Sequence, residues 1–132
     1  MVRCLFSLSI VITKNITFLK IICYTKNNMV EKSSVPEIVS FIKSEFKAKE
    51  VVVFGSYVRN KLTTNSDLDI FVIMDMNRKP YEQAALIRLK VDEKFGVSFP
   101  IDIIVRSPHY VEKRLKMGDF FIKDILKEGL RA

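Results

Sequence analysis

Two apolar segments with a polar segment between them place the strongest constraint on how this chain can fold. Residues 55–69 read GSYVRNKLTTNSDLD, preceded by VVVF and followed by IFVIM. Short runs rich in β-branched and aromatic residues predict buried strands at Val51–Phe54 and Leu68–Met74. Asp67 and Asp69 lie at the start of the second strand, although carboxylates are rarely buried without a partner. The pair therefore indicates a specialised site at the mouth of this strand.

The remaining pattern predicts helices and strands in alternation. The sequence SVPE at 34–37 has the form of a helix start, with proline in the first turn. The predicted elements are a helix over 34–49, a strand over 51–54, a short helix from 56, a strand over 68–74, a helix over 81–95, a strand over 101–105, a helix from 107 and a last helix ended by Gly129. The expected fold class is α/β (α+β), a small mixed sheet of three to four strands with helices packed on it.

Residues 1–28 differ in composition from the rest of the chain. They contain both cysteines, Cys4 and Cys23, and all their charged residues are basic: Arg3, Lys14, Lys20 and Lys26. We expect an N-terminal extension at 1–28 and one domain at 29–132. Three interpretations of the extension stay open: a biological start at Met29, a poorly packed segment, or a membrane anchor. An anchor would place Lys14 near the centre of the bilayer, where a charge is costly.

Charge and cysteine content narrow the class of protein. The net charge is +7, of which +4 comes from residues 1–28, so the domain carries only +3. No basic stripe with interleaved aromatic residues is visible along the domain, so charge alone does not select a nucleic-acid partner. The domain contains no cysteine, which excludes a disulfide framework and a cysteine zinc site there. A reducing, cytoplasmic setting fits best.

The acidic residues suggest a metal site. Residues i and i+2 of a strand point to the same face, so Asp67 and Asp69 would project together. Asp102 is a lone acid in the apolar strand that follows Pro100. Three carboxylates on neighbouring strands would repel one another unless a cation joined them, and Mg²⁺ prefers such oxygen ligands. The alternative interpretation is that the pair caps a turn and that Asp102 faces water from an edge strand.

The glycine-serine turn suggests a phosphate site. Gly55 allows a sharp turn out of the first strand, and the Ser56 hydroxyl is an additional donor. Backbone N–H groups at a following helix start would favour an anion. Arg59 is either a solvated helix residue or a phosphate contact. A phosphate site beside a carboxylate metal site would suit a nucleoside triphosphate.

Here the chain resembles the DNA polymerase β-like nucleotidyltransferases, whose motif is Gly-Ser, ten residues, Asp-x-Asp and a third Asp on a later strand. The stretch from Val35 to Leu130 is similar to the minimal nucleotidyltransferases (MNT) of that superfamily. The matching positions are Gly55, Ser56, Asp67 and Asp69, with Asp102 matching by context. Asn60 departs from the arginine-glycine that usually follows, without affecting the ligands.

The resemblance implies transfer of AMP from ATP, with pyrophosphate leaving. Asp67 and Asp69 would hold two Mg²⁺ ions, and Asp102 would bind the ion nearer the attacking hydroxyl and help to deprotonate it. Gly55 and Ser56 would hold the β- and γ-phosphates, with Arg59 as a further nucleotide-binding residue.

The resemblance also implies a partner. Minimal members of the family are often antitoxins paired with a HEPN-domain toxin, and some adenylylate a tyrosine of that toxin, so we expect this acceptor. The alternatives are a non-catalytic antitoxin that acts by binding, and a transferase that modifies a small molecule or RNA. The sequence leaves open the base preference, the acceptor, the presence of a homo-oligomer and the start codon.

Overall fold

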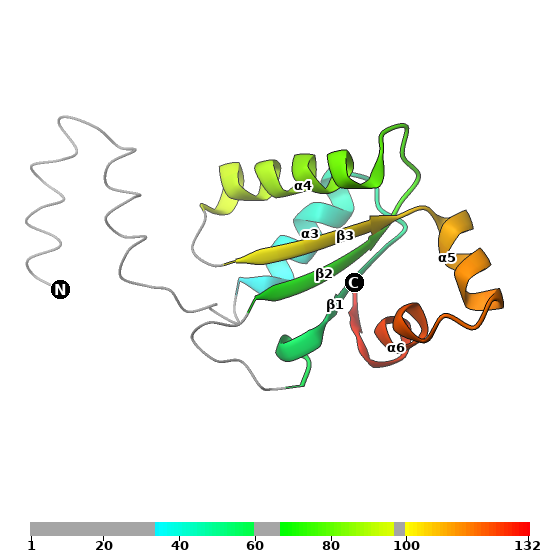
Figure 1. Ribbon diagram of the computed structural model, residues 1–132. Helices are drawn as coiled ribbons and strands as arrows, with labels where there is room; N and C mark the ends of the chain where they lie inside the picture. Colours follow the sequence, from blue (N-terminus) through cyan, green and yellow to red (C-terminus); the bar gives the residue numbers. More distant parts are fainter. Residues whose placement is uncertain (1–33, 60–66, 97–99) are drawn as a thin grey trace, which may run out of the picture.

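The computed structural model describes residues 34–59, 67–96 and 100–132. Helices and strands alternate along this part of the chain, as Figure 1 shows. In chain order the elements are α3 (Val35–Glu45), β1 (Glu50–Phe54), the 3₁₀ turn η1 (Gly55–Tyr57), β2 (Leu68–Ile73), α4 (Pro80–Phe95), β3 (Ile101–Arg106), α5 (Pro108–Lys116), α6 (Phe120–Glu128) and β4 (Leu130–Arg131).

The strands form one mixed sheet in the order β3-β2-β1-β4. β2 and β3 are parallel, and α4 supplies the crossover that a parallel pair requires. β1 runs antiparallel to both of its neighbours, β2 and β4. The prediction of a small mixed sheet with packed helices is therefore confirmed. The two-residue strand β4 was not predicted, because a pair of residues is too short to show a period.

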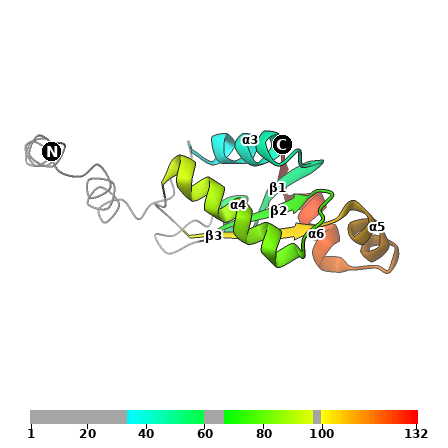
Figure 2. The ribbon, with the colours of Figure 1, turned by 90° about the horizontal axis from the view of Figure 1, so that it is seen from above.

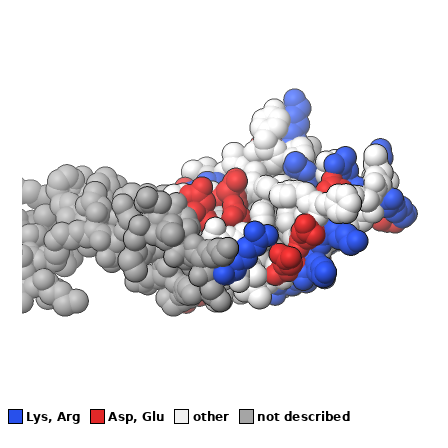
Figure 3. Space-filling model, turned by 60° about the horizontal axis from the view of Figure 1, so that its bottom comes forward, with Lys and Arg blue, Asp and Glu red and all other residues white. Residues whose placement is uncertain are grey.

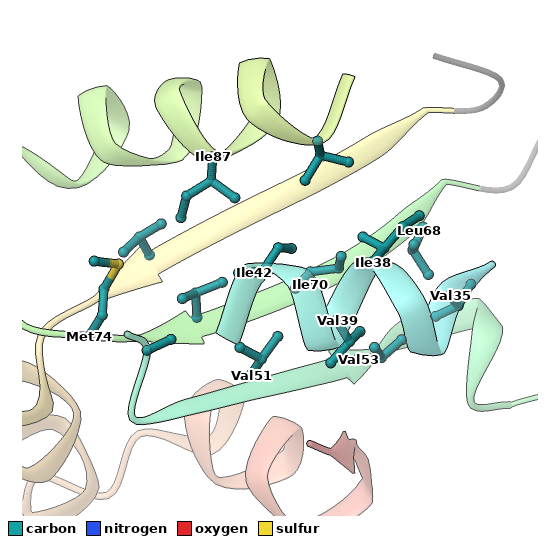
Figure 4. Close-up of a cluster of buried hydrophobic side chains, with 14 residues drawn as sticks. Val35, Ile38, Val39, Ile42, Val51, Val53, Leu68, Ile70, Met74 and Ile87 are labelled. Carbon is teal, nitrogen blue, oxygen red and sulfur yellow. The ribbon is translucent and has the colours of Figure 1, made fainter. Parts of the chain in front are cut away.

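Helices α3 and α4 cover one face of the sheet (Figure 2). Alternate residues of each strand point towards them, which is the two-residue period expected of strands. Figure 4 shows Ile38 and Ile42 of α3 and Ile87 of α4 directed at this face, where they meet strand residues such as Val51 and Ile70. All five side chains are fully buried, so burial on this face determines which residues of each strand point inward.

Helices α5 and α6 pack on the opposite face (Figure 1). Val52 and Phe71 point to that side and contact Ile122 and Ile125 of α6 in a second, smaller core. Phe54 extends this core, since its ring meets the Phe121 ring edge to face with 6.1 Å between the centroids. The end of β1 is thereby linked to α6.

The first described helix ends earlier than its apolar pattern predicted. α3 stops at Glu45, and Lys47 adopts the left-handed conformation with φ of 51°. The backbone N–H of Ala48 then donates to the carbonyl of Lys43 at 3.1 Å, which is the hydrogen bond of a Schellman C-cap. A lysine in place of the usual glycine concealed this cap in the sequence.

The other differences lie at the ends of predicted elements. The short helix expected from Ser56 is a single 3₁₀ turn in the described part of the chain, and residues 60–66 lie outside it. The expected extension at 1–28 and the alternative start at Met29 also fall outside the described ranges. Among the helices that are described, none has the length and apolar character needed to cross a membrane.

Gly129, directly after α6, packs closely against β1, and this contact gives a test of the fold. A Cβ atom at this position would overlap the Val52 side chain and lie 3.1 Å from the Val53 carbonyl oxygen. Gly129→Ala should therefore lower the free energy of unfolding by about 1–3 kcal/mol, measured by urea denaturation. Lys127→Ala, at an exposed position two residues earlier, should change it by less than about 0.5 kcal/mol. Equal effects would contradict the close approach.

Candidate active site

Sheet register brings two of the predicted acids together. Asp69 of β2 and Asp102 of β3 are direct partners in the parallel ladder. Neighbouring residues in a ladder point to the same face, and their strands lie about 4.8 Å apart. Asp67 comes two residues before Asp69, immediately outside β2. All three acids therefore belong to the end of the sheet where the two parallel strands begin.

The charges of these carboxylates affect one another. Partial burial raises the pKa of the Asp69 carboxyl above its usual range, and the charges of Asp102 and Asp67 raise it further. Asp67 and Asp102 are exposed, whereas Asp69 is half-buried between them. Figure 3 shows a group of acidic side chains on this face, at the end of the described domain. The site thus concentrates negative charge that a bound cation would offset.

Gly55 lies directly against this cluster. It has a φ of +73°, which a glycine adopts without strain. A Cβ atom added to it would overlap the Oδ2 atom of Asp69 and lie 3.2 Å from its Cγ atom. The first residue of η1 therefore leaves space that the Asp69 carboxylate fills. Ser56, half-buried, is the next residue of the same turn.

Arg59 is directed towards α6. Its Nη2 atom is 3.5 Å from a carboxylate oxygen of Glu128, and both side chains are more than half exposed. This pair borders a hollow of about 260 Å³ between η1 and α6. The hollow is also lined by the aromatic residues Phe54 and Phe121 and by Gly55 and Asp124.

Sequence reasoning did not identify this hollow. Its α6 residues recur four apart, as Phe121 with Ile125 and Asp124 with Glu128. That spacing indicates one helix face. It does not reveal which strand the face will meet, so only the packing of α6 on β1 places these residues beside Gly55.

The donor set suits a hard divalent cation. Mg²⁺ takes carboxylate oxygens and commonly keeps water and substrate phosphates as its other ligands. Within residues 34–59, 67–96 and 100–132, no three His, Cys, Asp or Glu side chains form a ready-made metal cage. A site completed by substrate phosphate needs no such cage, and one or two carboxylates are enough for Mg²⁺. Asp67, Asp69 and Asp102 are the residues that could hold it.

The structure thus brings five of the six predicted residues to one end of the sheet. Asp69, Asp102 and Gly55 are in direct register or contact, and Asp67 and Ser56 adjoin them in the chain. Arg59 lies on the other side of Gly55, against Glu128. The only histidine of the chain, His109, is on α5 and contributes nothing here.

Known proteins are similar to this chain in sequence. Residues 35–132 match the family model of the nucleotidyltransferase domain. The chain is 30% identical to "Putative protein adenylyltransferase MJ0604" of Methanocaldococcus jannaschii over 76% of this chain and 96% of that protein. It is 33% identical to "Putative protein adenylyltransferase MJ1379" of the same organism over 64% of this chain and 90% of that protein.

A solved structure is also similar. It is the structure of a "putative nucleotidyltransferase from Sulfolobus solfataricus". The two chains align with a TM-score of 0.45 and 20% identity, over 71% of this chain and 78% of that chain. The assignment of this protein rests on the sequence matches, which span the whole described domain. The chain therefore belongs to the nucleotidyltransferase domain family and is a nucleotidyltransferase.

Proposed function

We propose that this protein transfers AMP from ATP to a protein hydroxyl in a reaction that depends on Mg²⁺. The observation that supports it most is the close packing of the Asp69 carboxylate against Gly55, in the space that a side chain would fill. Asp69 is in turn the ladder partner of Asp102. A phosphate held at the turn would lie beside carboxylates that a cation can bridge. The relatives in Methanocaldococcus jannaschii carry names of protein adenylyltransferases, which favours a protein acceptor.

The acceptor that we propose is a tyrosine of a HEPN-domain toxin, so that the protein acts as its antitoxin. This follows from the resemblance to the minimal nucleotidyltransferases. The described domain consists of one sheet and its covering helices, without a second lobe to hold a small substrate. A folded partner could supply the missing wall of the site together with its hydroxyl.

Each site residue has a role in this proposal. Asp67 and Asp69 would hold Mg²⁺, which offsets the charge of the triphosphate and makes its phosphorus more electrophilic. The Ser56 hydroxyl would donate to a phosphate oxygen, and the absence of a side chain at Gly55 lets the Asp69 carboxylate approach the same turn. Asp102 would accept the proton of the attacking hydroxyl. The acceptor oxygen then bonds to the α-phosphorus as the bond to pyrophosphate breaks.

Arg59 would assist from the other side of the turn. Its pair with Glu128 is long and exposed, and such pairs contribute little stability, so the side chain can leave it at small cost. A triphosphate offers stronger, bidentate partners to a guanidinium. The hollow that Arg59 borders, which Phe54 and Phe121 also line, would then receive the nucleoside.

The first prediction concerns the acids. Asp67→Asn, Asp69→Asn and Asp102→Asn should each reduce label transfer from α-labelled ATP to the cognate toxin by about 100-fold or more. Asp75→Asn is the matched control, because Asp75 follows the far end of β2 and pairs with Lys49 at 3.1 Å. It should retain transfer. Equal transfer by all four variants would contradict the proposed site.

The second prediction compares two glycines with nearly the same positive φ. Gly55 and Gly96 have φ of 73° and 71°, but only at Gly55 would a Cβ atom meet the Asp69 carboxylate, whereas Gly96 has open space. Gly55→Ala should therefore reduce kcat for AMP transfer by about 10-fold or more, since misplacement near 1 Å can cost 100-fold. Gly96→Ala should lose stability only. A similar kcat for the two variants would mean that this contact has no catalytic role.

The third prediction concerns stability and metal. The folded-state pKa of Asp69 is raised, so the folded state holds this proton more tightly, and stability falls as pH rises through its titration. Asp69→Asn should consequently raise Tm without metal at pH 7, and the difference from wild type should close towards about pH 4. Added Mg²⁺ should raise Tm of the wild type more than that of the variant. An equal Mg²⁺ shift would exclude Asp69 as a ligand.

A further inference from the structure

A second candidate site lies at the opposite end of the parallel pair. After β2 the chain continues into α4 on one face of the sheet, and after β3 it continues into α5 on the other face (Figures 1 and 2). A crevice forms outside the carboxyl ends of adjacent parallel strands where their connections diverge in this way, and such crevices are general ligand sites in α/β sheets.

The crevice is present in the structure. It has a volume of about 580 Å³ and is lined by residues of both connections. The connection after β2 contributes Met76, Arg78, Pro80 and Tyr81, and the connection after β3 contributes Arg106, Ser107 and Tyr110. No acidic residue is among these lining residues. The crevice is thus walled by two arginines, two tyrosines and a serine.

Its arginines are not neutralised. Within the described part of the chain, neither Arg78 nor Arg106 forms an ion pair with a carboxylate. The acids nearest to Arg78 in sequence are engaged elsewhere: Asp75 pairs with Lys49, and Glu82 accepts from the backbone N–H of Lys79. The crevice therefore carries a local positive charge that favours an anion.

The tyrosines present flat apolar surfaces beside this charge. Tyr81 is 66% exposed and Tyr110 40%, so part of each side chain is open to solvent. The Arg106 guanidinium lies over the Tyr110 ring, 5.3 Å from its centroid, and both residues line the crevice. Arginines with exposed aromatic rings are the combination that holds phosphates and stacked bases of unpaired nucleotides.

We propose that this crevice binds a nucleotide unit, with its phosphate on Arg78 and Arg106 and its base against Tyr81 or Tyr110. It is distinct from the candidate active site, because Asp69 and Ile73 are already about 13 Å apart along β2 and the crevice lies beyond Ile73. Binding of a nucleotide in this crevice does not require a metal ion, because no carboxylate lines it. A free mononucleotide and a segment of single-stranded RNA share this chemistry.

The experiment uses the full chain in EDTA, which removes the metal-dependent part of nucleotide binding at the active site. One arm measures fluorescence anisotropy of a labelled oligouridylate, and the other follows backbone amide shifts in NMR spectra during titration with AMP. Arg78→Gln/Arg106→Gln should weaken binding about 10-fold or more and flatten its salt dependence. Tyr81→Ala should weaken it about five-fold or more through lost stacking. Arg106 is half-buried, so its substitution could disturb folding, whereas Arg78 is exposed. Arg78→Gln alone therefore tests the charge of the crevice without that risk.

The matched control is Lys123→Gln/Lys127→Gln, which removes the same charge from exposed positions on α6. It should leave binding within about two-fold of wild type. Binding in both arms indicates a site for free nucleotides, and binding of RNA alone indicates a single-strand site. Failure to bind in both arms, or equal weakening by the arginine and lysine variants, would overturn the proposal without affecting the proposed transfer reaction.

Discussion

The pairing of Asp69 with Asp102 across two parallel strands is the constraint on which the rest of this structure depends. It places two carboxylates side by side on one face, and Gly55 closes against one of them. Parallel pairing in turn requires a crossover, which α4 provides from the opposite face. The acidic face can remain open near the strand starts only because α5 and α6 pack further along it. This arrangement of strands and helices thus keeps the like charges of Asp69 and Asp102 close together and accessible.

The hydrophobic core maintains this arrangement. Leu68, Ile70 and Val72 alternate with the acidic and aromatic residues of β2 and are fully buried beneath α3 and α4. A register slip of one residue would move this set to the other face and turn Asp69 into the core. The cost of burying an ionised carboxylate adds to the loss of apolar burial in opposing such a slip. The position of the candidate site residue Asp69 and the packing of the core are therefore specified by the same strand.

Much of this could be predicted from the sequence, and the limits have physical causes. The strands, the long helix α4 and the three acids were visible because period and charge are local properties. β4 was too short for a period, and the lysine C-cap at Lys47 lacked the usual glycine. The hollow beside Gly55 depends on how α6 packs on β1. The crevice joins Arg78 and Arg106 from segments 28 residues apart, so no basic stripe is visible along the chain.

The positions of the acids and of the arginines give the domain an electrical polarity along its strands. One end of β2 is negative, through Asp67, Asp69 and Asp102, and the other is positive, through Arg78 and Arg106. These local charges would attract a polyanion to the arginine end of the strands and repel it from the acidic end before the surfaces touch. The effect weakens beyond about 8 Å at physiological ionic strength. The two ends of the same pair of strands therefore differ in the charge of the molecules that they favour.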